Sequence, residues 1–82
     1  MNILLKNPNT GRTKNNKQEI TSSAGQTVFT LDFTPAGNSL LAFVQGILNG
    51  EGTDYTLSGK VVTFIEGIRS NRKVLFFYAY ND

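Results

Sequence analysis

The fold is decided by residues 26–57, which read QTVFTLDFTPAGNSLLAFVQGILNGEGTDYTL. Short runs of β-branched and aromatic residues alternate there with turns that contain glycine. In the first run, residues 27–33, the side chains of Phe29, Leu31 and Phe33 fall on one face, which is the period of a half-buried strand. Pro35 ends this strand because proline has no backbone N–H to donate.

The next run, residues 39–45, is apolar on both faces. This pattern predicts a strand that runs through the interior or under a subunit contact. Gly46 is expected at the tight point of a hairpin, after which Ile47 and Leu48 resume the strand. A helix over residues 39–50 is the competing interpretation, because a short apolar run does not distinguish the two by period. Gly46 and the β-rich flanks favour the strand.

The rest of the chain repeats this rhythm. We expect strands at residues 54–57, 61–65 and 73–80, with a hairpin turn at residues 58–60 and a loop at residues 66–72. Residues 18–23 form a plausible polar edge strand. The sequence therefore predicts an all-β module over residues 18–82, a small antiparallel β-sandwich or barrel of about six to seven strands.

Residues 1–17, MNILLKNPNTGRTKNNK, differ in composition from the module. They carry four cations and no acid, whereas residues 18–82 carry four cations against six acids. We expect an extended basic arm that becomes ordered against a partner. A frayed terminus or an expression remnant is the alternative. The residues of the arm expected to bind the partner are Ile3, Leu4, Leu5, Lys6, Arg12, Lys14 and Lys17.

Composition bounds the chemistry. The 82 residues contain no cysteine and no histidine, which removes disulfides, thiolate metal sites and the commonest general base. The core of so small a domain is marginal, so subunit association is the expected additional source of stability. No apolar run approaches the roughly 20 residues of a membrane span, and MNILL is too short for a signal peptide. Synthesis in a cytoplasm and no membrane partner are therefore expected.

No residue is predicted to be catalytic or to bind a metal or cofactor, and the protein is not expected to be an enzyme. A carboxylate pair of Asp32 and Asp54 would suit glycoside hydrolysis if the fold brought the two together. The favoured interpretation places Asp32 on the solvent face and Asp54 as the cap of a turn. Residues 49–54 lack the ligand order of a calcium loop. Tyr55, Tyr78 and Tyr80 are candidate sugar platforms, although burial is the commoner fate of tyrosine.

A single-stranded nucleic-acid-binding barrel is one alternative function. The arm cations together with Arg69, Arg72 and Lys73 could contact phosphates. The aromatic rings that could stack on bases are those of Phe76, Phe77, Tyr78 and Tyr80. The module is net acidic, however, and aromatics at period 2 are first of all core. Nucleic acid is therefore not the expected partner.

Five pieces of the module, within residues 28–80, follow a common order. They are FTLDFTP at residues 29–35, AFVQGIL at 42–48, GTDYTLSG at 52–59, VTF at 62–64 and VLFFY at 74–78. This order resembles a β module of tailed-bacteriophage virion proteins, and GTDYTLSG is its most specific part. Two pieces depart from the family pattern. Gln45-Gly46 stands where Asn-Gly is usual, and the loop of Arg69 and Arg72 replaces a Gly-Asp turn.

The resemblance implies an exposed virion protein that is commonly a trimer. The expected function is that of a capsid-decoration or head-fibre protein, located in the virion and made in the host bacterial cytoplasm. Its arm would attach to capsid or tail proteins, and the module would be displayed as a homo-oligomer. The basic loop with Arg69, Arg72 and Lys73 is a possible second contact surface. A tail-fibre-type module that recognises carbohydrate or protein is the alternative.

Overall fold

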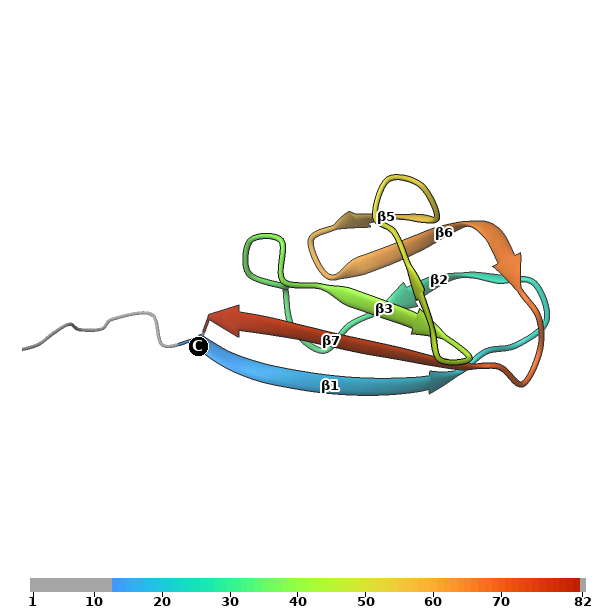
Figure 1. The fold of residues 1–82 in the computed structure, drawn as a ribbon, viewed down its shortest axis with the longest axis horizontal. Coiled ribbons are helices and arrows are strands. Elements are labelled where there is room, and N and C mark those ends of the chain that lie inside the picture. The colour runs from blue at the N-terminus through green and yellow to red at the C-terminus, as the bar shows by residue number, and fades with distance from the viewer. Residues whose placement is uncertain (1–12, 82) are drawn as a thin grey trace, which may run out of the picture.

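The computed structural model describes residues 13–81, which form a sandwich of two antiparallel sheets (Figure 1). One sheet has four strands in the order β1-β7-β3-β4, and the other has three in the order β2-β6-β5. The predicted all-β sandwich is confirmed, and no helix that could span a membrane occurs within the described residues. The strands are β1 (Thr13–Thr21), β2 (Gln26–Thr30), β3 (Leu41–Val44), β4 (Ile47–Asn49), β5 (Tyr55–Ser58), β6 (Val61–Ile68) and β7 (Lys73–Asn81).

The core lies between the two sheets and is largely aromatic. The Phe29 ring meets the Phe64 ring edge-on at 5.5 Å between centroids and the Phe76 ring at 5.9 Å. The period-2 prediction is confirmed for Phe29 and Leu31, which are both buried. Phe33 stays 41% exposed because β2 ends at Thr30 and the chain bends before it reaches that residue.

Residues 39–50 form a hairpin, so the helical alternative is wrong. Val44 pairs with Ile47, which leaves Gln45 and Gly46 as a two-residue turn between β3 and β4. Their φ angles are 51° and 80°. A type I′ turn requires this left-handed geometry at both central positions, and its twist matches that of the flanking strands. Glutamine therefore occupies a position at which asparagine would be less strained.

The first strand is longer than predicted. Residues 13–17 pair with β7 and belong to the sheet, so the predicted arm is shorter than expected. The Asn-rich composition of this segment is a poor β signal, and the strand is specified by the long partner strand instead. Asn16 adds a side-chain contact, because its Nδ2 donates to the Tyr78 hydroxyl at 3.0 Å. The predicted arm residues Ile3, Leu4, Leu5, Lys6 and Arg12 lie outside the described residues.

Side chains of β1 and β7 tie the four-stranded sheet to the other sheet. The Gln18 side chain accepts the Asp32 N–H at 2.9 Å and donates to the Thr30 carbonyl at 3.3 Å. The Tyr78 hydroxyl accepts the Phe33 N–H at 3.2 Å. The backbone groups at the end of β2 have no neighbouring strand to pair with, and these side chains provide their hydrogen-bond partners.

The predicted loop at residues 66–72 is also shorter, because β6 continues to Ile68. Ser22, which is buried, organises the remaining connection to β7. The Ser22 carbonyl accepts the Asn71 N–H at 2.8 Å, its hydroxyl accepts the Arg72 N–H at 3.0 Å, and the same hydroxyl donates to the Arg69 carbonyl. The loop backbone is therefore held from within.

Candidate functional site

The outer face of the four-stranded sheet carries a group of apolar side chains that do not belong to the core. Their neighbours along the strands, such as Ala42 and Phe76, are fully buried and point into the sandwich. Because side chains alternate along a strand, the intervening residues point outward. We call this group the apolar face, and it consists of Leu41 and Phe43 from β3, Leu48 from β4, and Leu75 and Phe77 from β7.

Three of these side chains are substantially exposed. The exposed fractions are 47% for Leu41, 57% for Leu48 and 37% for Phe77, and the remaining two residues are half-buried. Contiguous exposed apolar side chains are uncommon on monomeric proteins and mark interaction surfaces. The arrangement can therefore bind an apolar partner surface.

Strand register places the apolar face in two rows that cross the sheet. Phe43 is opposite Leu75 on one side and Leu48 on the other, and Leu41 is opposite Phe77. The Phe43 and Phe77 rings meet edge-on at 5.9 Å between centroids, which joins the two rows. The packing among these side chains makes the face one continuous surface.

Each row ends in a charged residue on β1. Glu19 lies opposite Leu75, and Lys17 lies opposite Phe77. Lys73 begins β7 on the same face, and its Nζ lies 3.8 Å from a Glu19 carboxylate oxygen. Both of these side chains are well exposed, so this ion pair adds little to stability. The apolar face thus has a charged margin along one side.

The surface is hollowed beside Leu41 and Phe77. This hollow encloses about 420 Å³ and lies against the half of β1 that begins at Thr13. Its lining is mainly apolar on the β3 and β7 side and polar on the β1 side. The residues that line it are Asn15, Asn16, Ser39, Leu41, Phe77, Tyr78 and Ala79.

The outer face of the three-stranded sheet has a different character. One row across its three strands consists of one apolar side chain and two side chains with hydroxyl groups: Val28, Thr63 and Thr56. Val28 is 50% exposed and Ile65 is 62% exposed, and Thr63 lies beside both of them on this face. The apolar surplus is therefore concentrated on one side of the sandwich.

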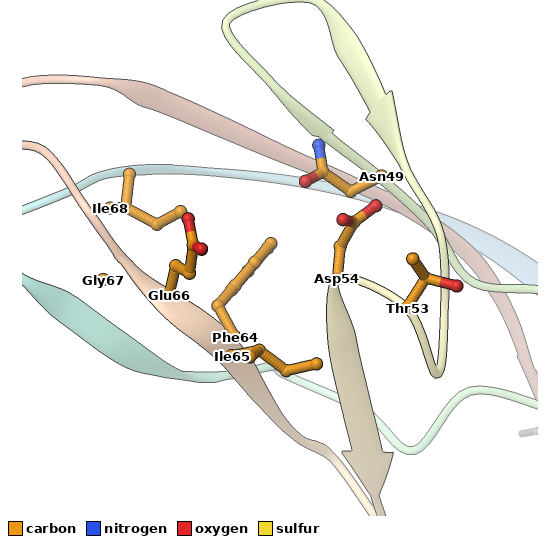
Figure 2. Close-up of a pocket in the computed structure, with 8 residues that line it drawn as sticks. All are labelled: Asn49, Thr53, Asp54, Phe64, Ile65, Glu66, Gly67 and Ile68. Atoms are coloured by element: carbon orange, nitrogen blue, oxygen red, sulfur yellow. The ribbon is translucent and has the colours of Figure 1, made fainter.

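A second hollow of about 260 Å³ lies between the β4–β5 connection and β6 (Figure 2). Figure 2 shows the Asp54 carboxylate beside the Asn49 side chain, with Glu66 on the β6 side. An Asp54 oxygen accepts the Gly50 N–H at 2.7 Å, which confirms Asp54 as a turn cap. Asp32 does not line this hollow. Within the described residues, no group of three or more metal-ligating side chains is close enough to hold an ion.

The predicted basic contact loop lies far from the point at which the arm joins the sheet. Lys73 pairs with Thr21, whereas Thr13 pairs with Asn81, so the two lie at opposite ends of β1 (Figure 1). At about 3.4 Å per residue the separation is about 27 Å. Arg69 is exposed and Arg72 is half-buried. The loop and Thr13, the first described residue, therefore do not share one surface.

Of the arm cations, Lys14 and Lys17 lie in β1 and are exposed. The structure places Lys17 at the end of a row of the apolar face, which the sequence did not predict. The two lysines are nevertheless part of the sheet, so neither belongs to a separate arm.

The candidate aromatic platforms are mostly core. Tyr55 and Tyr78 are buried, as is Phe76, so none of these rings can stack on a sugar or a base. Tyr80 is half-buried and stacks on Phe33 at 4.0 Å between centroids, with the rings 3° from parallel. Phe33 is the more exposed ring of this pair.

Burial raises the pKa of the Tyr55 phenol, and the carboxylates of Glu51 and Asp54 raise this pKa further. The neutral phenol is therefore favoured in the folded chain. We expect its contribution to stability to be complete below the ordinary phenol pKa of about 10 and to be lost as pH rises through the higher folded pKa. Urea midpoints between pH 9 and pH 11.5 measure this decline.

The matched variants are Tyr55→Phe and Tyr80→Phe. Tyr55→Phe is expected to flatten the alkaline decline, whereas Tyr80→Phe is expected to keep it. Lysine residues titrate in the same pH range in both variants, so their contribution cancels in the comparison. An unchanged alkaline slope in Tyr55→Phe would contradict the assignment.

Sequence reasoning did not select the residues of the apolar face, although a signal for them was present. Residues 39–45 are apolar on both faces, and the prediction of a subunit contact there depended on that pattern. The same two-sided pattern occurs at residues 74–77. Comparison with known proteins adds no assignment, because no protein-family model, curated protein or solved structure matches the chain.

Proposed function

We propose that the protein is a non-enzymatic structural protein of a tailed-phage virion, of the capsid-decoration or head-fibre type. It is made in the host bacterial cytoplasm, attaches to capsid or tail proteins through its N-terminal segment, and displays a self-associating β-sandwich. The observation that carries the proposal is the apolar face. The resemblance of residues 28–80 to virion β modules supports the choice of a virion over other assemblies.

The apolar face supports an assembly role because the core is complete without it. Among residues 13–81, ten buried apolar side chains fill the space between the sheets, and none of them belongs to the apolar face. Five large apolar residues on the outside therefore contribute little to the folding of a single chain. Covering them by association would stabilise a domain whose core is small.

The proposed anchor is the segment before β1. Ile3, Leu4 and Leu5 supply apolar groups, and Lys6 and Arg12 supply charge that suits an acidic protein surface. Because the described part of β1 is Thr13–Thr21, removal of residues 1–12 leaves every described residue of the sheet in place.

The test compares the full chain with residues 13–82 in co-sedimentation with virions assembled without the protein. We expect the full chain to join the particles, and residues 13–82 to stay folded by circular dichroism yet remain in the supernatant. Two matched variants separate the forces involved: Lys6→Gln with Arg12→Gln removes charge, and Leu4→Ser with Leu5→Ser removes apolar groups. Equal incorporation of residues 13–82 would refute the anchor.

A tail-fibre-type recognition module is the second candidate, and the exposed Phe33 ring favours it. The stack on Tyr80 holds this ring in a fixed orientation, which suits contact with a sugar face. Glycan-array binding that is lost in Phe33→Ala and kept in Phe77→Ala would support this candidate over the first.

A further inference from the structure

We infer that the apolar face binds the same face of a second copy of this chain, about a two-fold axis that lies in the interface and crosses the strands. The inference rests on the self-association in the proposed function, but it does not depend on a virion. The order of the side chains in the two rows identifies a second copy of the chain as the partner that covers the apolar face.

The first row reads Leu48, Phe43, Leu75 and Glu19 across β4, β3, β7 and β1. The second row reads Leu41, Phe77 and Lys17 across β3, β7 and β1. The rows are two residues apart along each strand, which is about 6.8 Å.

A two-fold axis midway between the rows, and parallel to them, exchanges one row for the other. Each strand of one copy then lies over the same strand of the second copy, running in the opposite direction. Phe43 meets Leu41 of the second copy, and Leu75 meets Phe77. On β1, Glu19 meets Lys17 of the second copy, and symmetry repeats this contact. The face is therefore complementary to itself in both apolar character and charge.

The separation between the sheets is compatible with these contacts. Packed sheets lie about 10 Å apart, a gap that lysine and glutamate side chains can bridge from opposite sides. The strands of packed sheets cross at about 30°, which keeps the two β1 strands near each other close to the axis.

Other arrangements do not bring the charges together. An axis parallel to the strands places β1 over β4, where the first row ends in Leu48 and offers Glu19 no cation. A three-fold axis parallel to the strands keeps each residue at the same height along the axis in all three copies. Residues of different copies therefore meet at equal heights, and Lys17, which lies two residues from Glu19 along β1, does not reach Glu19 of a neighbour. The charges thus favour two copies in place of the three that the resemblance implies.

The size of the face predicts a reversible pair. From strand spacings of about 4.8 Å and 3.4 Å per residue, the four strands cover about 400 Å² in projection. This is about half of the 800 Å² of accessible surface that each partner of a standard specific interface buries, which is the size of a weak, transient contact. We therefore expect dissociation on dilution in the micromolar range.

The first test is sedimentation of the full chain over a range of concentrations. We expect a two-copy species that Phe77→Glu abolishes while circular dichroism stays unchanged. Ile65→Glu is the matched control, because Ile65 is also an exposed strand residue that gains the same charge, but it lies on the other sheet. It should pair as the unmodified chain does.

The second test is a charge exchange. Lys17→Glu and Glu19→Lys should each weaken pairing by about tenfold or more, because each places like charges opposite one another. The double variant restores opposite charges at both symmetric contacts and should recover the original affinity. Lys60→Glu, in the exposed turn between β5 and β6, controls for the change in net charge.

The inference is overturned if the unmodified chain stays single at all concentrations, if three copies form, or if the double variant does not recover pairing. It is also overturned if the chain lacking residues 1–12 pairs and the full chain does not. In that case residues 1–12, and not a second copy, would cover the apolar face of the full chain. Failure of particle incorporation with pairing intact would refute the virion role alone. Incorporation without pairing would refute this inference and the self-association in the proposed function, and would leave the anchor and the virion role intact.

Discussion

Phe76→Ala is expected to lower the free energy of unfolding by about 3–5 kcal/mol. The Phe76 side chain is fully buried, and its ring packs on Phe29 at the middle of the core. It lies on β7, where it pairs with Gln18 on one side and Ala42 on the other. Because small domains are stable by only about 5 kcal/mol, this loss would leave much of the chain unfolded.

Urea unfolding followed by circular dichroism measures the effect. Phe76→Leu keeps most of the volume and provides a variant that still folds, with an expected loss of about 1–2 kcal/mol. Phe33→Ala removes the same atoms from a ring that is 41% exposed, so its cost should be clearly smaller than that of Phe76→Ala. Equal losses from Phe76→Ala and Phe33→Ala would refute the placement of the core.

Gly67→Ala is expected to cost about 2–3 kcal/mol because the added methyl group meets backbone. A Cβ atom at Gly67 would lie 2.8 Å from the Gly25 carbonyl oxygen and 3.0 Å from the Gly25 Cα. The Gly25 N–H also donates to the Ile68 carbonyl at 2.9 Å, so a shift of the chain there would disturb this hydrogen bond. The close approach of the two backbones therefore requires glycine in β6.

Gly50→Ala is the matched control. A Cβ atom at Gly50 has the Asp54 Oδ2 at 3.7 Å as its nearest neighbour, which is an ordinary contact. We expect a change of less than about 0.5 kcal/mol. If thermal and urea unfolding show the same loss for the two variants, the crowding at Gly67 is not the cause.

Local pattern accounts for most of the strands. Alternation of Phe29 with polar neighbours predicts β2, and the same period at Val62 and Phe64 predicts β6. Glycine marks the hairpin turns because it adopts positive φ without strain, as at Gly46 and Gly59. These signals operate within a few residues, which is why one sequence is enough to identify them.

Features that depend on distant parts of the chain could not be predicted. Residues 13–17 form a strand only because β7 offers a long backbone edge. Ser22 looks like an ordinary turn residue, yet it is buried and binds the β6–β7 connection. The sequence predicts Gly67 in a loop, because no residue near it in sequence indicates its contact with Gly25.

The candidate site was predictable only in part. Two-sided apolar runs predict a strand with one face under another subunit, but they do not indicate that β3 and β7 are neighbours. Register decides that Phe43, Leu75, Leu41 and Phe77 form one surface, and that Glu19 and Lys17 close its rows. Register is set by the whole sheet and is not encoded in any single segment.

The position of β7 between β1 and β3 has a consequence for synthesis on the ribosome. Thr13 pairs with Asn81, so the two strands are 68 residues apart where β1 begins. Until β7 emerges, β1 has no strand partner and the β3–β4 hairpin has an open edge. Pairing over such a distance is slow compared with hairpin formation. The nascent chain should therefore remain vulnerable to proteases until β7 has left the exit tunnel, and then gain resistance in a single step.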